Sequence, residues 1–136
     1  MYRAPMRSRS GDGDPQPAID RAHRRGLCGF GDDPSTERLA RRVERFAAAP
    51  DGSFVWTRDS DGLYWLGRLA GPYFHDADGR GVDLIHVRRC RWRAEPVLEP
   101  QVPPAVVATF GRGGRNFQQI HDDRVGAESE RLWQSD

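Results

Sequence analysis

Aromatic rings and arginines are concentrated in the middle of the chain, between Phe54 and Arg93. Three of the four tryptophans and two of the three tyrosines fall in this stretch. A flat ring can stack on a nucleobase, and a guanidinium group can hold a phosphate. The combination points to nucleic-acid binding, although the same rings are also the usual filling of a small β-barrel.

Five rings are candidates for a pocket around a base, and we expect two or three of them to line it while the others join the core. They are Phe30, Trp56, Trp65, Tyr73 and Trp92. Trp56 is the first choice, because it precedes Thr57 and Arg58 at an expected sheet edge. Stacking on a ring is worth about 1–3 kcal/mol per base, and a nearby polar group would read the base edge.

Positive charge gathers in the second half of the chain. From Leu84 to Ile120 there are six arginines and two acidic residues, a local charge of +4 in a protein with a net charge of +1. Within 86–93, three arginines stand at alternate positions and would lie on the same face of a strand. Such a face could bind phosphate, or it could simply be exposed to solvent. The glycine-rich turn at 111–114 offers either backbone donors for phosphate or a plain hairpin turn. The candidate phosphate contacts are Arg88, Arg89, Arg91, Arg112, Arg115 and Asn116.

Catalysis has little support in the sequence. The four histidines show no metal-ligand spacing, and Cys28 and Cys90 are isolated from each other and from any zinc motif. We therefore predict a protein that is not an enzyme and needs no metal or cofactor. The chain shows no signal peptide and no apolar run of membrane-spanning length, so we expect a cytoplasmic protein without membrane contact.

The surrounding elements must position these residues. Residues 1–17 are polar and predict a disordered tail, followed by one domain over 18–136. Asp33 and Pro34 predict the cap and first residue of a helix that ends at Pro50, with Leu39, Val43 and Phe46 as its buried stripe.

The remaining segments read mainly as strands. Gly26–Gly31 indicates a short strand or turn, and strands are expected over 54–58, 63–69, 73–75, 82–93 and 115–120. The segment 104–110 fits either a helical turn or a strand, and 122–136 is polar with Leu132 and Trp133 as an apolar anchor. One helix with five or six short strands predicts an α+β fold built on a small barrel-like sheet.

The order of these motifs resembles a known family. Gly29-Phe30-Gly31, the helix, the strand 54–58, the run Tyr64–Tyr73, and His86-Val87-Arg88 leading to Trp92 together resemble the EVE/YTH-like branch of the PUA-like superfamily. The resemblance covers about residues 26–120 and includes modified-base readers of prokaryotic restriction-type systems. It implies a five- to six-stranded barrel with a flanking helix and a pocket for a flipped, modified base. This chain has Phe30 where the family often has tryptophan, and so lacks that indole donor.

Two functions from different classes stay open. The first is a nucleic-acid reader that takes DNA in preference to RNA and acts with a separate effector or nuclease protein in restriction or defence. The second is a non-catalytic structural or protein-interaction domain with the same barrel and no working pocket. A cleft with exposed rings and arginines at its rim would favour the first.

Overall fold

The computed structural model describes residues 1–6, 14–113, 117–122 and 124–135. Within them the chain forms one mixed sheet with the strand order β2-β5-β4-β3-β1-β6. The strands are β1 (Tyr2–Arg3), β2 (Leu27–Phe30), β3 (Phe54–Arg58), β4 (Tyr64–His75), β5 (His86–Trp92) and β6 (Gln118–Gln119). The α-helices are α1 (Gln16–Arg25), α2 (Thr36–Ala48), α3 (Pro104–Gly111) and α4 (Val125–Gln134), with short 3₁₀ helices at Ala77–Val82 and Glu99–Gln101.

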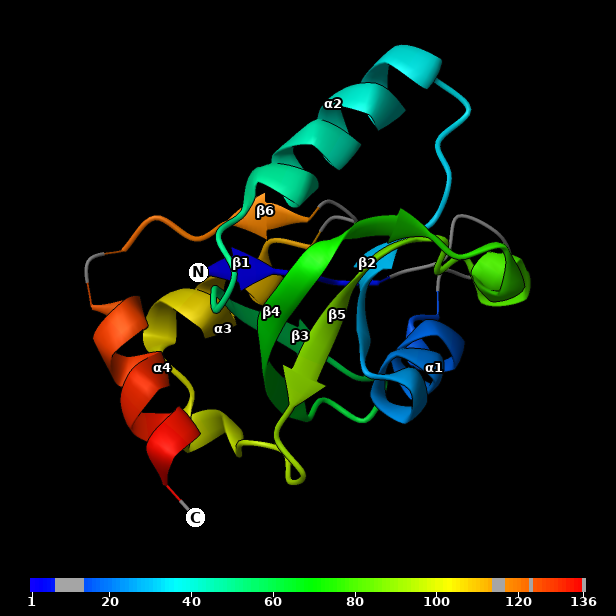
Figure 1. Ribbon diagram of the computed structural model, residues 1–136. Helices are drawn as coiled ribbons and strands as arrows, with labels where there is room; N and C mark the ends of the chain where they lie inside the picture. Colours follow the sequence, from blue (N-terminus) through cyan, green and yellow to red (C-terminus); the bar gives the residue numbers. More distant parts are fainter. Residues whose placement is uncertain (7–13, 114–116, 123, 136) are drawn as a thin grey trace.

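The predicted α+β class is confirmed by this sheet and its flanking helices (Figure 1). β2, β5, β4 and β3 are antiparallel neighbours, whereas β1 runs parallel to β3. The hydrogen-bonded order ends at β2 and β6, and the described strands do not close into a barrel. Among the described residues, no helix has both the length and the apolar character needed to cross a membrane.

The first residues belong to the sheet, so the prediction of a disordered tail is wrong for residues 1–6. Tyr2 and Arg3 pair with Val55 and Trp56, and the Ala4 amide donates to the Trp56 carbonyl at 2.8 Å. Ala4 and Met6 are 1% and 2% exposed. Composition missed this strand because backbone pairing and the buried side chains of Ala4 and Met6 hold it, whereas tail predictions rest on the apolar content of the whole segment. Residues 7–13 of the predicted tail lie outside the described residues.

Helix α1 was not predicted. Its first two residues belong to the predicted disordered tail, and no helix was expected over residues 18–25. The helix ends at Gly26, whose φ of 68° places it in the left-handed region that glycine favours. The chain then enters β2, where a Cβ on Gly29 would lie 1.9 Å from the His86 carbonyl oxygen. The small residues of the 26–31 segment thus allow β2 and β5 to approach closely.

Helix α2 is the predicted helix, with a corrected start. Ser35, not Asp33, is the N-cap and accepts from the Arg38 amide, while Asp33 accepts from the Ser35 amide one turn earlier. Phe46 is fully buried, and Leu39 and Val43 pack beside it half-buried. The rest of the helix is largely exposed and projects from the body of the molecule (Figure 1).

The central strands follow the sequence pattern closely. β3 and β4 match the predicted strands over 54–58 and 63–69 and pair as an antiparallel hairpin. β4 continues through Gly71-Pro72 by a shift in its register with β5 between Ala70 and Phe74. β5 begins at His86 instead of residue 82, because Ala77–Val82 forms a 3₁₀ turn. Of the predicted last strand over 115–120, Gln118–Gln119 form β6, while residues 115 and 116 lie outside the described residues.

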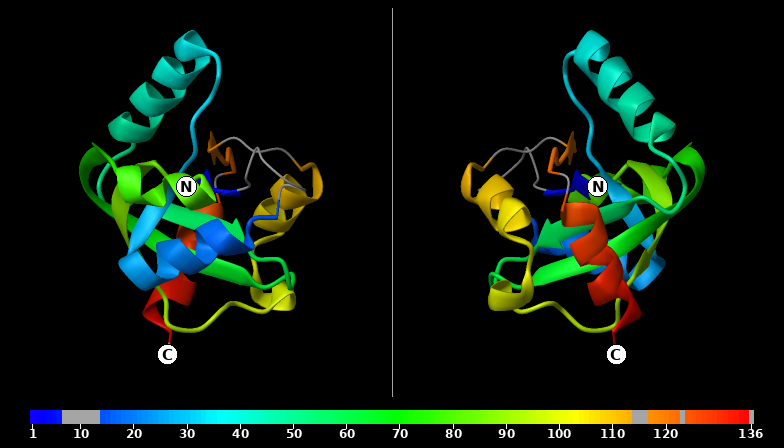
Figure 2. Two further views of the ribbon diagram at one scale, coloured as in Figure 1. Left: turned by 90° about the vertical axis from the view of Figure 1, so that its right-hand side faces the viewer. Right: turned by 90° about the vertical axis from the view of Figure 1, so that its left-hand side faces the viewer.

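The C-terminal third contains more helix than predicted. Segment 104–110 belongs to helix α3, and the polar end of the chain forms α4. Both helices pack on one apolar cluster that includes Trp56, Leu66, Val106 and Val125. Separate clusters lie under the C-terminal end of α2 and under α1. The helices therefore pack against different parts of the sheet (Figure 2).

Candidate nucleic-acid interface

The five predicted pocket rings do not form a cage. Trp56 is fully buried, and its indole N–H donates to the Ser129 hydroxyl at 3.1 Å in α4. Phe30 is 4% exposed and packs edge-on against Phe46. Both rings belong to the core. Helix α4, which was not predicted, covers Trp56, and helix α2, whose position on the sheet was not predicted, covers Phe30. Trp56, the first choice for a base contact, is therefore corrected to a core residue.

Trp65 and Trp92 are half-buried and do come together, but around a side chain of the protein itself. The His23 ring of α1 lies 4.4 Å from the Trp65 ring and 5.0 Å from the Trp92 ring. Their indole N–H groups donate to the Asp59 carboxylate and the Leu27 carbonyl. Burial lowers the pKa of His23, and no described residue hydrogen-bonds its Nε2. The two tryptophans therefore pack against His23 and do not face an open cleft among the described pockets.

Tyr73, the fifth ring, is part of a hydrogen-bonded chain that the sequence did not reveal. Its hydroxyl lies 2.8 Å from His86 Nδ1, and His86 Nε2 lies 2.6 Å from Asp32 Oδ1. Burial and the Asp32 charge raise the pKa of the Tyr73 phenol. The chain ties β4, β5 and the loop before α2 together. Because His86 is nearly enclosed and both its nitrogens have partners, this chain serves to fasten the loop.

Arg88 was predicted to contact phosphate, but its guanidinium is enclosed and bonded to groups of the protein itself. It is 2% exposed and donates to the carbonyls of Phe46, Ala49 and Gly71, and its Nη2 lies 2.7 Å from an Asp51 carboxylate oxygen. Carbonyls at the C-terminal end of a helix attract a cation, because they lack helical partners there. Arg88 is therefore the anchor of the C-terminal end of α2.

The remaining predicted phosphate contacts are dispersed. Arg89 and Arg91 are exposed on β5, where the Arg89 guanidinium lies 5.3 Å from the Phe74 ring centre. Arg112 is exposed at the end of α3 and donates to the Thr109 hydroxyl. Arg115 and Asn116 lie outside the described residues. Of the described candidates, only Arg112 is near the pocket described next.

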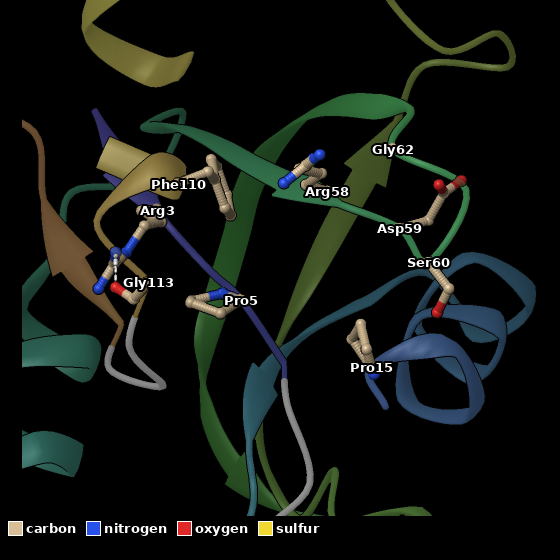
Figure 3. A pocket seen from close by; sticks show the side chains of 9 residues that line it. All are labelled: Arg3, Pro5, Pro15, Arg58, Asp59, Ser60, Gly62, Phe110 and Gly113. Carbon is tan, nitrogen blue, oxygen red and sulfur yellow. Dashed lines mark hydrogen bonds between the residues drawn. The ribbon is translucent and has the colours of Figure 1, made fainter. Parts of the chain in front are cut away.

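A recess of about 240 Å³ opens between the β3–β4 turn, β1 and α3 (Figure 3), and we call it the nucleotide pocket after the ligand that we propose for it below. Its lining residues are Arg3, Pro5, Pro15, Arg58, Asp59, Ser60, Gly62, Phe110 and Gly113. None of the five predicted rings is among them. The recess exists because the N-terminal strand, which was expected to be disordered, runs along its floor.

Three side chains define the chemistry of the nucleotide pocket. Phe110 is half-buried and meets Tyr64 edge-on, so part of its ring is left exposed. Arg58 is exposed, lies 5.7 Å from the Tyr64 ring centre, and has no described acid within ion-pair distance. Arg3 is buried and donates to the Thr109 and Gly113 carbonyls, and burial together with the nearby Arg112 charge lowers its pKa.

The lining also contains one acidic residue, and the hydrogen bonds that it accepts orient its carboxylate but leave its negative charge in place. Asp59 already accepts from the Asp61 and Leu63 amides and from the Trp65 indole, so its carboxylate is engaged in the turn. The pocket thus combines an exposed guanidinium with a partly exposed ring, which suits a planar anion such as a nucleotide. Among the described residues, no group of three or more His, Cys, Asp or Glu side chains could hold a metal ion.

Sequence reasoning missed this pocket for identifiable reasons. Arg58 was noted only as a neighbour of Trp56, and Phe110 stood in a segment of undecided structure. The signal that could have found Arg58 is its place at the end of a predicted strand before a turn, where side chains stay exposed. Arg3 could not be found, because its role depends on β1. No protein-family model, curated protein or solved structure matches the chain.

Proposed function

We propose that the protein is a nucleic-acid-binding reader domain and that the nucleotide pocket accepts one nucleotide of its ligand. The observation that carries this proposal is the exposed Arg58 guanidinium, without an acidic partner in the described structure, beside the half-exposed Phe110 ring. A phosphate would lie on Arg58 and a base on Phe110. The resemblance to the EVE/YTH-like branch supports the same class of ligand, with the binding residues moved from the predicted rings.

The proposal includes the expected biological setting. DNA is the preferred ligand, with a separate effector or nuclease acting on what the domain has bound. Arg89 and Arg91 on β5 lie on a different part of the sheet from the pocket and supply a second positive surface. They would add binding that does not depend on sequence or modification, because phosphate contacts carry no base information.

The test compares Arg58→Gln and Phe110→Leu with the parent protein, using fluorescence anisotropy with labelled single-stranded DNA and RNA. A hydrogen bond to a charged group is worth about 1.5–3 kcal/mol, so Arg58→Gln should weaken binding by roughly ten- to a hundredfold. Phe110→Leu keeps the apolar packing but removes the aromatic face, and should weaken binding by about tenfold.

Arg24→Gln is the matched control, because it removes an exposed arginine from α1 without touching the pocket. It should bind as the parent does. Folded Arg58→Gln and Phe110→Leu proteins with parental affinity would overturn the pocket. Absence of binding by the parent to every oligonucleotide would favour the protein-interaction alternative.

A further inference from the structure

A second recess of about 500 Å³, which we call the edge groove, lies between the C-terminal half of α2 and the edge strand β6. Figure 1 shows these two elements facing one another at the same end of the molecule. The lining residues are Tyr2, Arg45, Ala48, Ala49, Phe117, Gln118, Gln119 and His121. None of the predicted site residues is among them.

Two aromatic rings form a stack in the edge groove. The Tyr2 and Phe117 ring centres are 4.8 Å apart with 15° between their planes, and Phe46 supports Phe117 edge-on from beneath α2. Tyr2 and Phe117 are both half-buried, whereas Phe46 is fully buried. A nearly parallel pair of partly exposed rings, backed by a core residue, is a platform on which a further planar group can stack.

The charge around the edge groove fits a polyanion. Arg45 is exposed on α2, and no described acidic residue lies within ion-pair distance of it. His121 is exposed on the opposite side, and none of the lining residues is acidic. Asp122, the next residue along the chain, accepts from the Arg124 amide. Arg45 would bind a phosphate more strongly than an uncharged peptide carbonyl, because a hydrogen bond between two charged groups is the stronger one.

A hydrogen bond links the edge groove to the nucleotide pocket. Arg3, which lines the pocket, donates from Nη2 to Gln118 Oε1 in the groove at 2.9 Å. Arginine cannot accept a hydrogen bond, so this contact fixes the Gln118 amide with its oxygen toward Arg3. One hydrogen-bonded pair of side chains on neighbouring strands therefore joins the linings of the two recesses.

We propose that the edge groove binds the nucleotides flanking the one in the nucleotide pocket, and that the ligand is single-stranded. This inference rests on the proposed function. A base can stack on Tyr2 and Phe117 only if it is unpaired, because duplex bases expose their edges and not their faces. Arg45 then contacts a phosphate of the same strand.

The experiment measures the binding of three ligands: a nucleoside monophosphate, a single strand of about ten nucleotides and the corresponding duplex. The strand is long enough to reach beyond one pocket. Arg45→Gln and Phe117→Leu should each weaken binding of the strand by about tenfold and leave the monophosphate unaffected. The salt slope of strand binding should fall by about 0.7 in Arg45→Gln, as expected for one lost phosphate contact.

Arg41→Gln is the control, because Arg41 lies on the same helix one turn earlier, outside the groove, and pairs with Glu37. It should bind every ligand as the parent does. Arg45 is exposed, so Arg45→Gln should not affect folding. If this variant kept the strand affinity and the salt slope of the parent, the proposed role of the edge groove would be wrong. Duplex binding as tight as strand binding would do the same. Failure of the proposed function would be seen separately: Arg58→Gln would then leave monophosphate binding unchanged.

Discussion

At the scale of the residue, His23 shows how a polar side chain is held in an apolar setting. Its ring lies between Trp65 and Trp92, and no described residue hydrogen-bonds its Nε2. Such a site favours the neutral imidazole, since protonation would place a charge where access to water is limited. Burial is the main cause of the lowered His23 pKa, and the opposing charges of Asp20 and Asp59 are weaker.

The folded protein should therefore lose stability as the pH falls below the ordinary histidine pKa of 6.5. In that range the unfolded chain takes up a proton at His23 before the folded protein does, so protonation favours unfolding. Above this pH both states hold the neutral ring, and the effect vanishes. Melting temperatures at about pH 7.5 and about pH 5.5 measure it.

His23→Phe isolates this contribution, because it keeps a ring between the two tryptophans and cannot be protonated. We expect a smaller loss of melting temperature on acidification in the variant than in the parent. Equal losses in the two proteins would show that other groups cause the acid sensitivity.

At the scale of the element, α2 is a helix held by its C-terminal end. Arg88 binds its last carbonyls, and Phe46 is its one fully buried side chain. At its other end, Asp33 is buried beside Arg42, with an N–O distance of 3.6 Å. These anchors let an otherwise exposed helix project from the sheet and form one wall of the edge groove.

Phe46→Ala should cost about 3–5 kcal/mol of unfolding free energy, because it leaves a cavity beneath α2. It also removes the support of Phe117, with which Phe46 makes an edge-on contact at 4.8 Å. Chemical denaturation measures the change. Leu39→Ala, at a half-buried position nearer the N-terminal end of the helix, should cost clearly less. Similar losses at the two positions would mean that α2 is held along its whole length.

At the scale of the whole molecule, positive charge is scattered over several surfaces. Arg88 is enclosed, Arg89 and Arg91 lie on β5, and Arg58 and Arg45 lie at two separate recesses. With a net charge of +1, the protein has little long-range attraction for a polyanion. Binding must then come from a few local phosphate contacts.

We accordingly predict a shallow salt dependence for binding to a single strand. Contacts from Arg58 and Arg45 alone correspond to a log–log slope of roughly −1.4, at about −0.7 per phosphate. Contribution from the β5 surface would steepen the slope, and Arg91→Gln would then make it shallower by about 0.7, as expected for one lost phosphate contact. A titration of affinity against salt concentration distinguishes these cases. A slope near zero would contradict phosphate binding altogether.

The sequence by itself determined the elements whose signals are local. The stripe of α2, its end at Pro50-Asp51-Gly52, the turn between β3 and β4, and most of β5 follow from periodicity and turn chemistry within a few residues of each position. These features need no knowledge of distant partners, and the α+β class follows from them.

Only the tertiary structure decided which residues are available to a ligand. Trp56 and Arg88 have the types and spacing of binding residues, yet α4 covers the first and the end of α2 enfolds the second. Both contacts join segments dozens of residues apart. Burial depends on such long-range packing. Because Trp56 and Arg88 are buried, the candidate site consists of Arg58 and Phe110 instead of the predicted rings. The same holds for β1, whose pairing with β3 supplies the floor of the nucleotide pocket and one ring of the edge groove.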